Sequence, residues 1–220
     1  MCEKRESIMK TYGSKQEILK VAERNFKKHG YDATTFQMIA KELRITPGTI
    51  TYHFKNKHWI LHQLFREFFL KLSDYINKNV VNDFNYYVYY CVFYIYVYRV
   101  VLKSENSQKL FEIESLDPAF KKINADTNEK LFRLITNDYK KGFSKDDVHL
   151  AAVMYSGARA SLVQEYNEAD GGITIDDWCF HHSRLIGILS GLDEAAIQKN
   201  VRRAFDFANS HIPPSIYLLE

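Results

Sequence analysis

The first quarter of the chain carries apolar residues at the spacing of amphipathic helices. One stripe, at positions i, i+1, i+4 and i+8, consists of Ile18, Leu19, Ala22 and Phe26. A second stripe, at positions i, i+3, i+4 and i+7, consists of Phe36, Ile39, Ala40 and Leu43. Both spacings bring the apolar side chains to one helix face. The pattern predicts a helix that opens with a capping box at Ser14 and ends at Gly30, and a shorter helix over about 34–43.

A third short helix is predicted directly after this pair. Thr46 is a good N-cap, and Pro47 fits the first helical position because its missing N–H would be unpaired there anyway. The helix ends at about His53, with Ile50 and Phe54 facing inward. The residues left on or beside its outer face are Thr49, Thr51, Tyr52 and His53. Two short helices joined by a tight turn, with polar and aromatic groups outward on the second, are typical of a helix-turn-helix that enters the major groove of DNA.

Helical patterns fill the rest of the chain. A long pattern starts at His58 and runs to about Lys78, joining the first three helices to the remaining ones. Further helices are expected over 83–103, 106–115, 119–141, 144–168, 174–191 and 193–210. The chain is therefore predicted to be all-α, with a helix-turn-helix DNA-binding domain over residues 1–60 and a second, larger helical domain over residues 61–220.

Residues 84–98 form an uncharged run, FNYYVYYCVFYIYVY, with eight aromatic side chains from Tyr86 to Tyr98. Its second half alternates as a strand would, and its aromatic and β-branched content also favours a strand. Its length argues otherwise, because roughly twenty residues from Asp83 to Lys103 without a turn signal exceed an ordinary strand. The run is also short of the ~20 apolar residues that a bilayer requires. We therefore expect a buried core helix whose tyrosine hydroxyls need partners or water.

Charge is distributed unevenly along the chain. The 220 residues carry a net charge of +3 and are 46% hydrophobic, which is enough to bury one large core or one small and one medium domain. Residues 1–63 hold 12 Lys and Arg against 6 Asp and Glu, whereas residues 64–220 hold 18 against 21. The positive charge thus accompanies the helix-turn-helix, as phosphate binding requires. Taken alone, the same charge also fits a solvated surface.

Other chemistries find little support in the residue pattern. Cys2, Cys91 and Cys179 have no CxxC spacing, which argues against disulfides and zinc and fits a reducing cytosol. The first residues lack the apolar segment of a signal peptide, so we expect a cytoplasmic protein. Adjacent histidines at 181 and 182 point about 100° apart on a helix and are poorly placed for one metal ion. No nucleophile motif or phosphate-binding glycine loop is present, so we expect no enzyme, metal or cofactor.

The N-terminal pattern resembles the TetR family of bacterial transcriptional regulators over about fifty residues. The matching positions are Ile18, Ala22, Phe26, Gly30, Tyr31, Thr34, Thr35, Ile39, Ala40, Leu43, Gly48, Thr49, His53, Phe54, Lys57 and Leu61. Two positions depart from the family: Arg44 stands where the turn usually has Gly, and Thr51 stands where the second helix usually has Tyr. The turn position normally needs a left-handed backbone, which a non-Gly residue adopts at a cost of roughly 1–2 kcal/mol.

The resemblance, taken with the helix pattern, assigns a DNA surface. As a hypothesis, the residues that contact phosphates are Thr35, Thr46, Thr51, Tyr52 and Lys57. The residues expected to reach the major groove are Thr49, His53 and the edge of Tyr52. Pro47 and Gly48 let the start of the helix approach the DNA backbone closely. The expected partner is a double-stranded, palindromic operator with half-sites about one DNA turn apart.

The family also implies a homodimer and a small effector. Small-residue faces at 183, 187 and 191, and at 156–161, are candidates for a four-helix-bundle dimer, although they equally fit packing within one chain. The candidate residues for a largely apolar or aromatic effector are Tyr90, Tyr94, Tyr98, Phe132, Tyr155 and Arg159. Arg99 is a second cationic candidate for an acidic ligand group. We expect a repressor, with a DNA-binding adaptor that binds a protein partner as the alternative.

Overall fold

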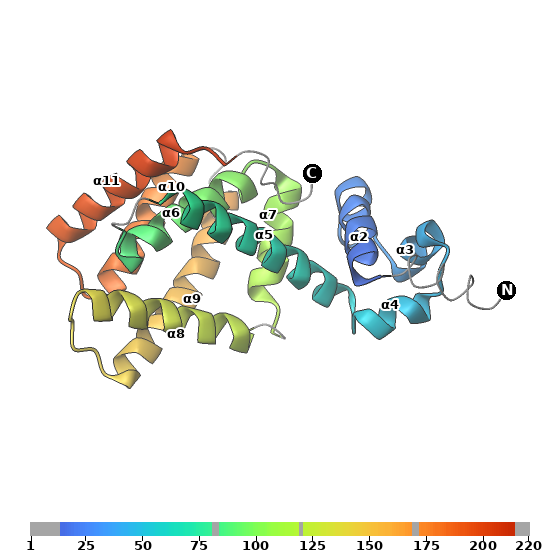
Figure 1. The fold of residues 1–220 in the computed structure, drawn as a ribbon, viewed down its shortest axis with the longest axis horizontal. Coiled ribbons are helices and arrows are strands. Elements are labelled where there is room, and N and C mark those ends of the chain that lie inside the picture. Colours follow the sequence, from blue (N-terminus) through green and yellow to red (C-terminus); the bar gives the residue numbers. More distant parts are fainter. Residues whose placement is uncertain (1–13, 81–83, 119–120, 169–171, 214–220) are drawn as a thin grey trace.

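The computed structural model describes residues 14–80, 84–118, 121–168 and 172–213, and within these ranges all regular structure is helical (Figure 1). The helices are α2 (Lys15–His29), α3 (Phe36–Leu43), α4 (Pro47–His53), α5 (Lys57–Asn79), α6 (Tyr86–Val101), α7 (Glu105–Leu116), α8 (Lys121–Asp138), α9 (Lys145–Glu168), α10 (Ile175–Leu189) and α11 (Glu194–Ser210). The predicted all-α fold is confirmed. The expected first residues of the helix from 119 lie outside the described residues.

Helices α2, α3 and α4 form a small N-terminal head (Figure 1). Ser14 caps α2 in the predicted capping box with Glu17, and Thr46 caps α4 with Pro47 in the first turn. The apolar stripes meet in one core, where Ile18, Ala22 and Phe26 are fully buried. This core fixes the angle between the three short helices, none of which would be stable alone.

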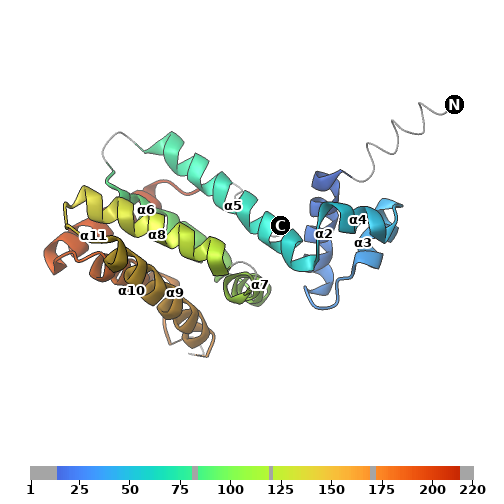
Figure 2. The same cartoon turned by 90° about the horizontal axis from the view of Figure 1, so that it is seen from below.

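Helix α5 runs from the head into the larger domain (Figure 2). Its start packs on α2 of the head, and its later turns lie against α6 and α7. The 23-residue helix keeps one buried face along its length, consisting of Ile60, Leu61, Leu64, Phe65, Phe68, Leu72 and Ile76. The helix continues without interruption across residues 60 and 61, so any tilt of α5 at its far end also moves the head.

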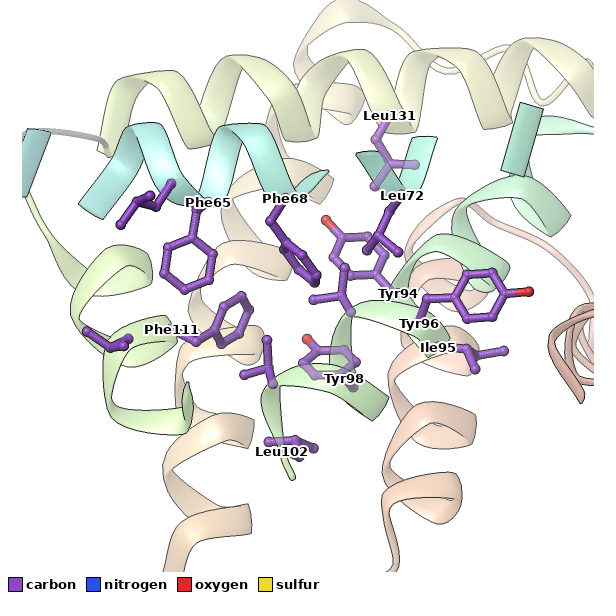
Figure 3. Close-up of a cluster of buried hydrophobic side chains, with 14 of the residues drawn as sticks. Phe65, Phe68, Leu72, Tyr94, Ile95, Tyr96, Tyr98, Leu102, Phe111 and Leu131 are labelled. Atoms are coloured by element: carbon purple, nitrogen blue, oxygen red, sulfur yellow. The ribbon is translucent and has the colours of Figure 1, made fainter. Parts of the chain in front are cut away.

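The aromatic segment is the buried helix α6, as its length predicted. It contacts α5, α7, α8, α10 and α11, and its neighbours leave little of it exposed. Figure 3 shows Phe65 of α5, Tyr98 of α6 and Phe111 of α7 gathered in one cluster, with the Phe111 ring centroid 5.9 Å from Phe65 and 6.0 Å from Tyr98. Within the described part of the chain, no helix is long and apolar enough to cross a membrane.

Polar groups enter this core with the tyrosines. The Tyr87 hydroxyl donates to the Ser183 carbonyl at 2.9 Å, and the Tyr96 hydroxyl donates to the His211 carbonyl. The Tyr155 hydroxyl lies 2.9 Å from Nε2 of fully buried His182. These bonds remove much of the cost of burying polar groups in an apolar core.

The buried His182 predicts a pH-dependent stability. Burial, followed by the nearby charge of Arg159, lowers the pKa of His182 to about 3, whereas an unfolded histidine titrates near ~6.5. Below ~pH 6.5 the unfolded chain therefore binds a proton that the native chain does not. The free energy of unfolding consequently decreases as the pH is lowered from ~6.5 to about 3. At ~pH 5 this costs roughly 2 kcal/mol of unfolding free energy relative to pH 7.

Urea unfolding at both pH values checks this prediction. His182→Gln, which keeps a polar group near Tyr155, is expected to reduce the loss between pH 7 and pH 5 by roughly 2 kcal/mol. His181→Gln is the matched control, because the neighbouring histidine is exposed. An unchanged loss in His182→Gln would mean that His182 is not held neutral by the fold.

Candidate functional sites

The start of α4 is held by its threonine cap. The Thr49 N–H donates to Thr46 Oγ1 at 3.3 Å, and the two threonine hydroxyls lie 3.1 Å apart. Pro47 and Gly48 follow the cap and are exposed. On the opposite side of the helix, Ile50 is fully buried. The inner face therefore anchors α4 to the head and leaves its outer face open.

The outer face of α4 presents the side chains that the sequence predicted. Tyr52 is 85% exposed, and its ring makes an edge contact with the half-buried His53 at 5.2 Å between centroids. The exposed Thr51 turns its hydroxyl back to the Gly48 carbonyl at 3.0 Å. Thr35 caps α3 by accepting from the Met38 N–H. The Thr35 hydroxyl accepts from the backbone and keeps its own hydrogen free to donate to a phosphate oxygen, whereas the hydrogen of the Thr51 hydroxyl is donated to the Gly48 carbonyl.

Arg44 adopts the left-handed conformation expected at the turn between α3 and α4, with φ 56° and ψ 38°. The Ile45 N–H reaches the Ala40 carbonyl at 3.0 Å and the Arg44 N–H reaches the Lys41 carbonyl at 3.3 Å. These two bonds make a Schellman ending for α3. The turn thus forms without the usual glycine, and it adds an exposed cation beside α4.

Lys57 occupies a position that the sequence did not predict. Its ammonium donates to the carbonyls of Tyr31 at 2.6 Å, Thr34 at 3.1 Å and Asp32 at 3.2 Å. It also lies 4.3 Å from the centroid of the Tyr31 ring. An ammonium has three hydrogens to donate, so these carbonyls match its donors in number. Lys57 therefore holds the turn between α2 and α3 against the start of α5.

Replacing Lys57 tests this arrangement. Lys57→Met is expected to lower the unfolding free energy by about 2 kcal/mol, because hydrogen bonds to a charged donor contribute about 1.5–3 kcal/mol. Lys55→Met, at an exposed position nearby, is the control and should be close to neutral. Urea unfolding gives the comparison. If Lys57 instead contacts phosphate, stability will be retained and the salt slope of DNA binding will fall by about one.

A cavity of about 720 Å³ lies beside α6 in the larger domain, with walls from α5 through α9. Its aromatic lining residues are Trp59, Phe69, Tyr89, Tyr90, Phe93 and Tyr94. Its ionisable lining residues are His62, Arg66, Glu114 and Arg159. Size, aromatic walls and a few polar groups together are typical of sites for small ligands.

The predicted ligand residues divide into two groups in the structure. Tyr90, Tyr94 and Arg159 line the cavity. The three that do not line it are fully buried: Tyr98, Phe132 and Tyr155. Sequence reasoning missed the contributions of α5 and α8, among them Trp59 and Ile123, whose apolar character signalled only core positions. The other cationic candidate, Arg99, is paired with Asp176 at 2.9 Å outside this cavity.

Helix α7 connects the cavity region with the head. Lys109 Nζ lies 2.7 Å from Asp32 Oδ2 in the turn that Lys57 holds. At the start of α5, His58 Nδ1 lies 2.5 Å from Asp117 Oδ2, just after α7 ends. One turn further along α5, His62 approaches the Glu114 carboxylate at 3.4 Å, and both residues line the cavity. The cavity wall and the support of the head thus share α7.

The small-residue stripe of α10 packs inside the chain. A Cβ on Gly187 would come 2.6 Å from the Tyr87 hydroxyl and 2.7 Å from Ile197, so α6 and α11 approach α10 closely here. Ser183 is also fully buried. The outward apolar residues of α9 and α10 are instead Leu150, Val153, Met154, Phe180 and Ile188, each at least 38% exposed. This α9–α10 face is available for a partner.

The two described cysteines, Cys91 and Cys179, are buried free thiols. Burial raises the pKa of both to about 12, so neither is a thiolate near neutral pH. Among the residues that the structure describes, no three His, Cys, Asp or Glu gather into a group suited to a metal ion.

Comparisons with known proteins agree with the geometry of the head. Residues 18–64 match the model of the family "Bacterial regulatory proteins, tetR family". The structure is similar to TylP, a TetR regulator from Streptomyces fradiae, with TM-score 0.53 and 17% identity over 90% of this chain and 97% of that one. It is also similar to the fatty acid degradation regulator FadR from Bacillus halodurans, with TM-score 0.49 and 20% identity over 80% and 94% of the two chains. No curated protein sequence matches the chain.

A helix-turn-helix head joined by a long helix to a larger helical domain is the architecture that the chain shares with TylP. The match to this family model covers the DNA-binding head, and the similarity to TylP shows that the larger domain shares the fold of that regulator. The matched head is that of the bacterial regulatory proteins of this family.

Proposed function

We propose that this protein is a ligand-responsive repressor that binds a palindromic operator as a homodimer. The observation that carries the proposal is the open outer face of α4, with Tyr52 85% exposed while Ile50 on the inner face is fully buried. A recognition helix must present polar side chains of this kind to the base edges. The cavity and the α9–α10 face supply the two remaining parts of the proposal.

The proposed DNA contacts follow the described surface. Thr49, Tyr52 and His53 read base edges in the major groove. The hydroxyls of Thr35 and Thr46 bind phosphates, and that of Thr51 does so after it turns away from the Gly48 carbonyl. Exposed Pro47 and Gly48 allow a close backbone approach. For Lys57 we propose a supporting role, in which its ammonium fixes the turn on which the head depends.

The α9–α10 face is the proposed dimer interface. Two copies of an antiparallel helix pair joined through exposed apolar residues form a four-helix bundle, and a two-fold axis makes the same patch serve both protomers. A dimer also presents two copies of α4 to half-sites about one DNA turn apart. The small-residue stripe of α10 is buried within the chain and cannot contact a second protomer. We therefore expect the dimer contacts at the outward residues around Met154.

The cavity favours a small effector over a protein-binding adaptor. It is bordered by α5, which carries the head, and by α7, which contacts the head through Lys109 and Asp32. A ligand that separates these helices changes the position of the head. Coupling of this type is typically worth 1–3 kcal/mol between ligand and DNA.

Selection from a randomised duplex pool at two salt concentrations tests the DNA function. The wild-type chain is expected to enrich a palindrome with half-sites about one turn apart. Tyr52→Ala should lose or relax that motif. Tyr86→Ala, which removes another exposed tyrosine from the larger domain, should retain it. Weak, salt-sensitive retention without a motif in the wild type would refute sequence-specific regulation.

Sedimentation of variants tests the interface. Met154→Glu places a charge at a side chain that is 61% exposed on the α9–α10 face. We expect a monomer, with palindrome affinity reduced by about 100-fold because the second head no longer binds in the same event. Ile212→Glu, at an aliphatic residue that is 77% exposed near the end of α11, is the control. A Met154→Glu dimer with full affinity would place the interface elsewhere.

A further inference from the structure

Arg159 differs from three other arginines of the described residues in forming no ion pair with a carboxylate. Arg24, Arg99 and Arg184 each form an ion pair with an acidic side chain. Arg159 is half-buried in the cavity wall and, within the described ranges, takes part in no ion pair. Its position on α9 turns the guanidinium toward α7, where it lies 5.3 Å from the centroid of the Phe111 ring.

The hydrogen-bonding capacity of Arg159 is largely unused by the described residues. One guanidinium nitrogen donates to Ser115 Oγ at 3.0 Å. A guanidinium carries five N–H donors in a fixed plane, an arrangement that matches the two oxygens of a carboxylate. A half-buried cation with spare donors is unfavourable in an empty cavity and favourable beside an anion.

The charge of Glu114 favours the charged form of Arg159, but the two side chains form no ion pair within the described residues. Glu114 is only 4% exposed, and its carboxylate lies 3.4 Å from His62 Nδ1. Arg66 adds a second, exposed guanidinium to the lining. Two arginines against one carboxylate leave one positive charge in excess. A cationic ligand would meet that excess charge, and a neutral one would leave it without a partner.

The apolar walls indicate the shape of the ligand's body. Phe93 makes ring contacts with Phe69 at 5.7 Å and with Tyr94 at 5.4 Å between centroids, and Tyr89 contacts Tyr90 at 5.8 Å. These tilted and edge contacts leave ring faces and edges bordering the cavity, and aromatic rings prefer to contact another ring in offset or edge geometry. The walls therefore suit a flat, largely apolar molecule.

We propose that the cavity binds a planar organic monoanion whose acid group pairs with Arg159 while its rings lie among the aromatic side chains of α5 and α6. This inference rests on the proposed effector role of the cavity and narrows the effector to one chemical class. The acid group replaces the missing carboxylate partner, and burial of the rings supplies most of the apolar contact.

Two fluorescent probes that differ by the acid group test the proposal. Anilinonaphthalene sulfonate and N-phenylnaphthylamine share their rings, but only the first carries a negative charge. Both are titrated into the full chain without DNA. The wild-type chain is expected to bind the sulfonate more tightly than the neutral probe. Arg159→Gln is expected to lower the affinity for the sulfonate by about 10- to 100-fold and to leave the affinity for the neutral probe unchanged. Arg99→Gln is the control, because Arg99 already has Asp176 as its partner.

Folding of the variants is checked by thermal unfolding. Arg159→Gln removes a half-buried charge that forms no ion pair with an acidic residue, so its melting temperature should be unchanged or higher. If that variant fails to fold, Arg159→Lys keeps the charge without the fork, and an intermediate loss of sulfonate affinity is expected. Equal binding of both probes by wild type, or an unchanged preference in the Arg159 variants, would overturn the proposal.

These outcomes are independent of the DNA experiment. If the wild-type chain prefers the sulfonate but selects no palindrome, the anion site is supported and the proposed repressor function is refuted. If the wild-type chain selects a palindrome but binds both probes equally, DNA recognition is supported and the anion site is refuted.

Discussion

Burial of the aromatic helix α6 is the constraint on which the regulatory half of the molecule depends. An aromatic helix of this kind is stable in water only when other helices cover it, and α5, α7, α8, α10 and α11 do so. Close approach at Gly187 and the hydrogen bond from Tyr87 to Ser183 fix the α10 side. On the side facing α5 and α8 the cover is incomplete, and the exposed ring edges form the cavity.

The same packing places the cavity next to α5 and α7, the two helices of the larger domain that contact the head. Helix α5 is a wall of the cavity and also packs on α2, so the two halves share one rigid element. Helix α7 adds the contacts of Lys109 with Asp32 and of Asp117 with His58. An exposed ion pair such as that of Lys109 with Asp32 contributes little to stability. The value of the two contacts here is geometric, because they tie the orientation of the head to the position of α7.

The local features were predictable, and the long-range ones were not. Caps at Ser14 and Thr46, the turn at Arg44 and the helical nature of α6 follow from neighbouring residues and from segment length. The three carbonyls around Lys57 come from residues more than twenty positions earlier, and no local pattern encodes them. Trp59 and Ile123 line the cavity, although the sequence predicts only core positions for them. Apolar character alone does not distinguish a packed side chain from one that lines a cavity. The pairing of Arg99 and the isolation of Arg159 likewise depend on helices distant in sequence.

Linkage between the cavity and the DNA surface is the central claim, and one titration tests it most directly. The wild-type chain is bound to its selected duplex, and DNA affinity is measured as anilinonaphthalene sulfonate is added to saturation. The account predicts that the affinity falls by roughly 5- to 150-fold, and that Arg159→Gln binds the duplex normally but no longer responds at the same probe concentration. DNA affinity that stays constant while the wild-type cavity is saturated would contradict it.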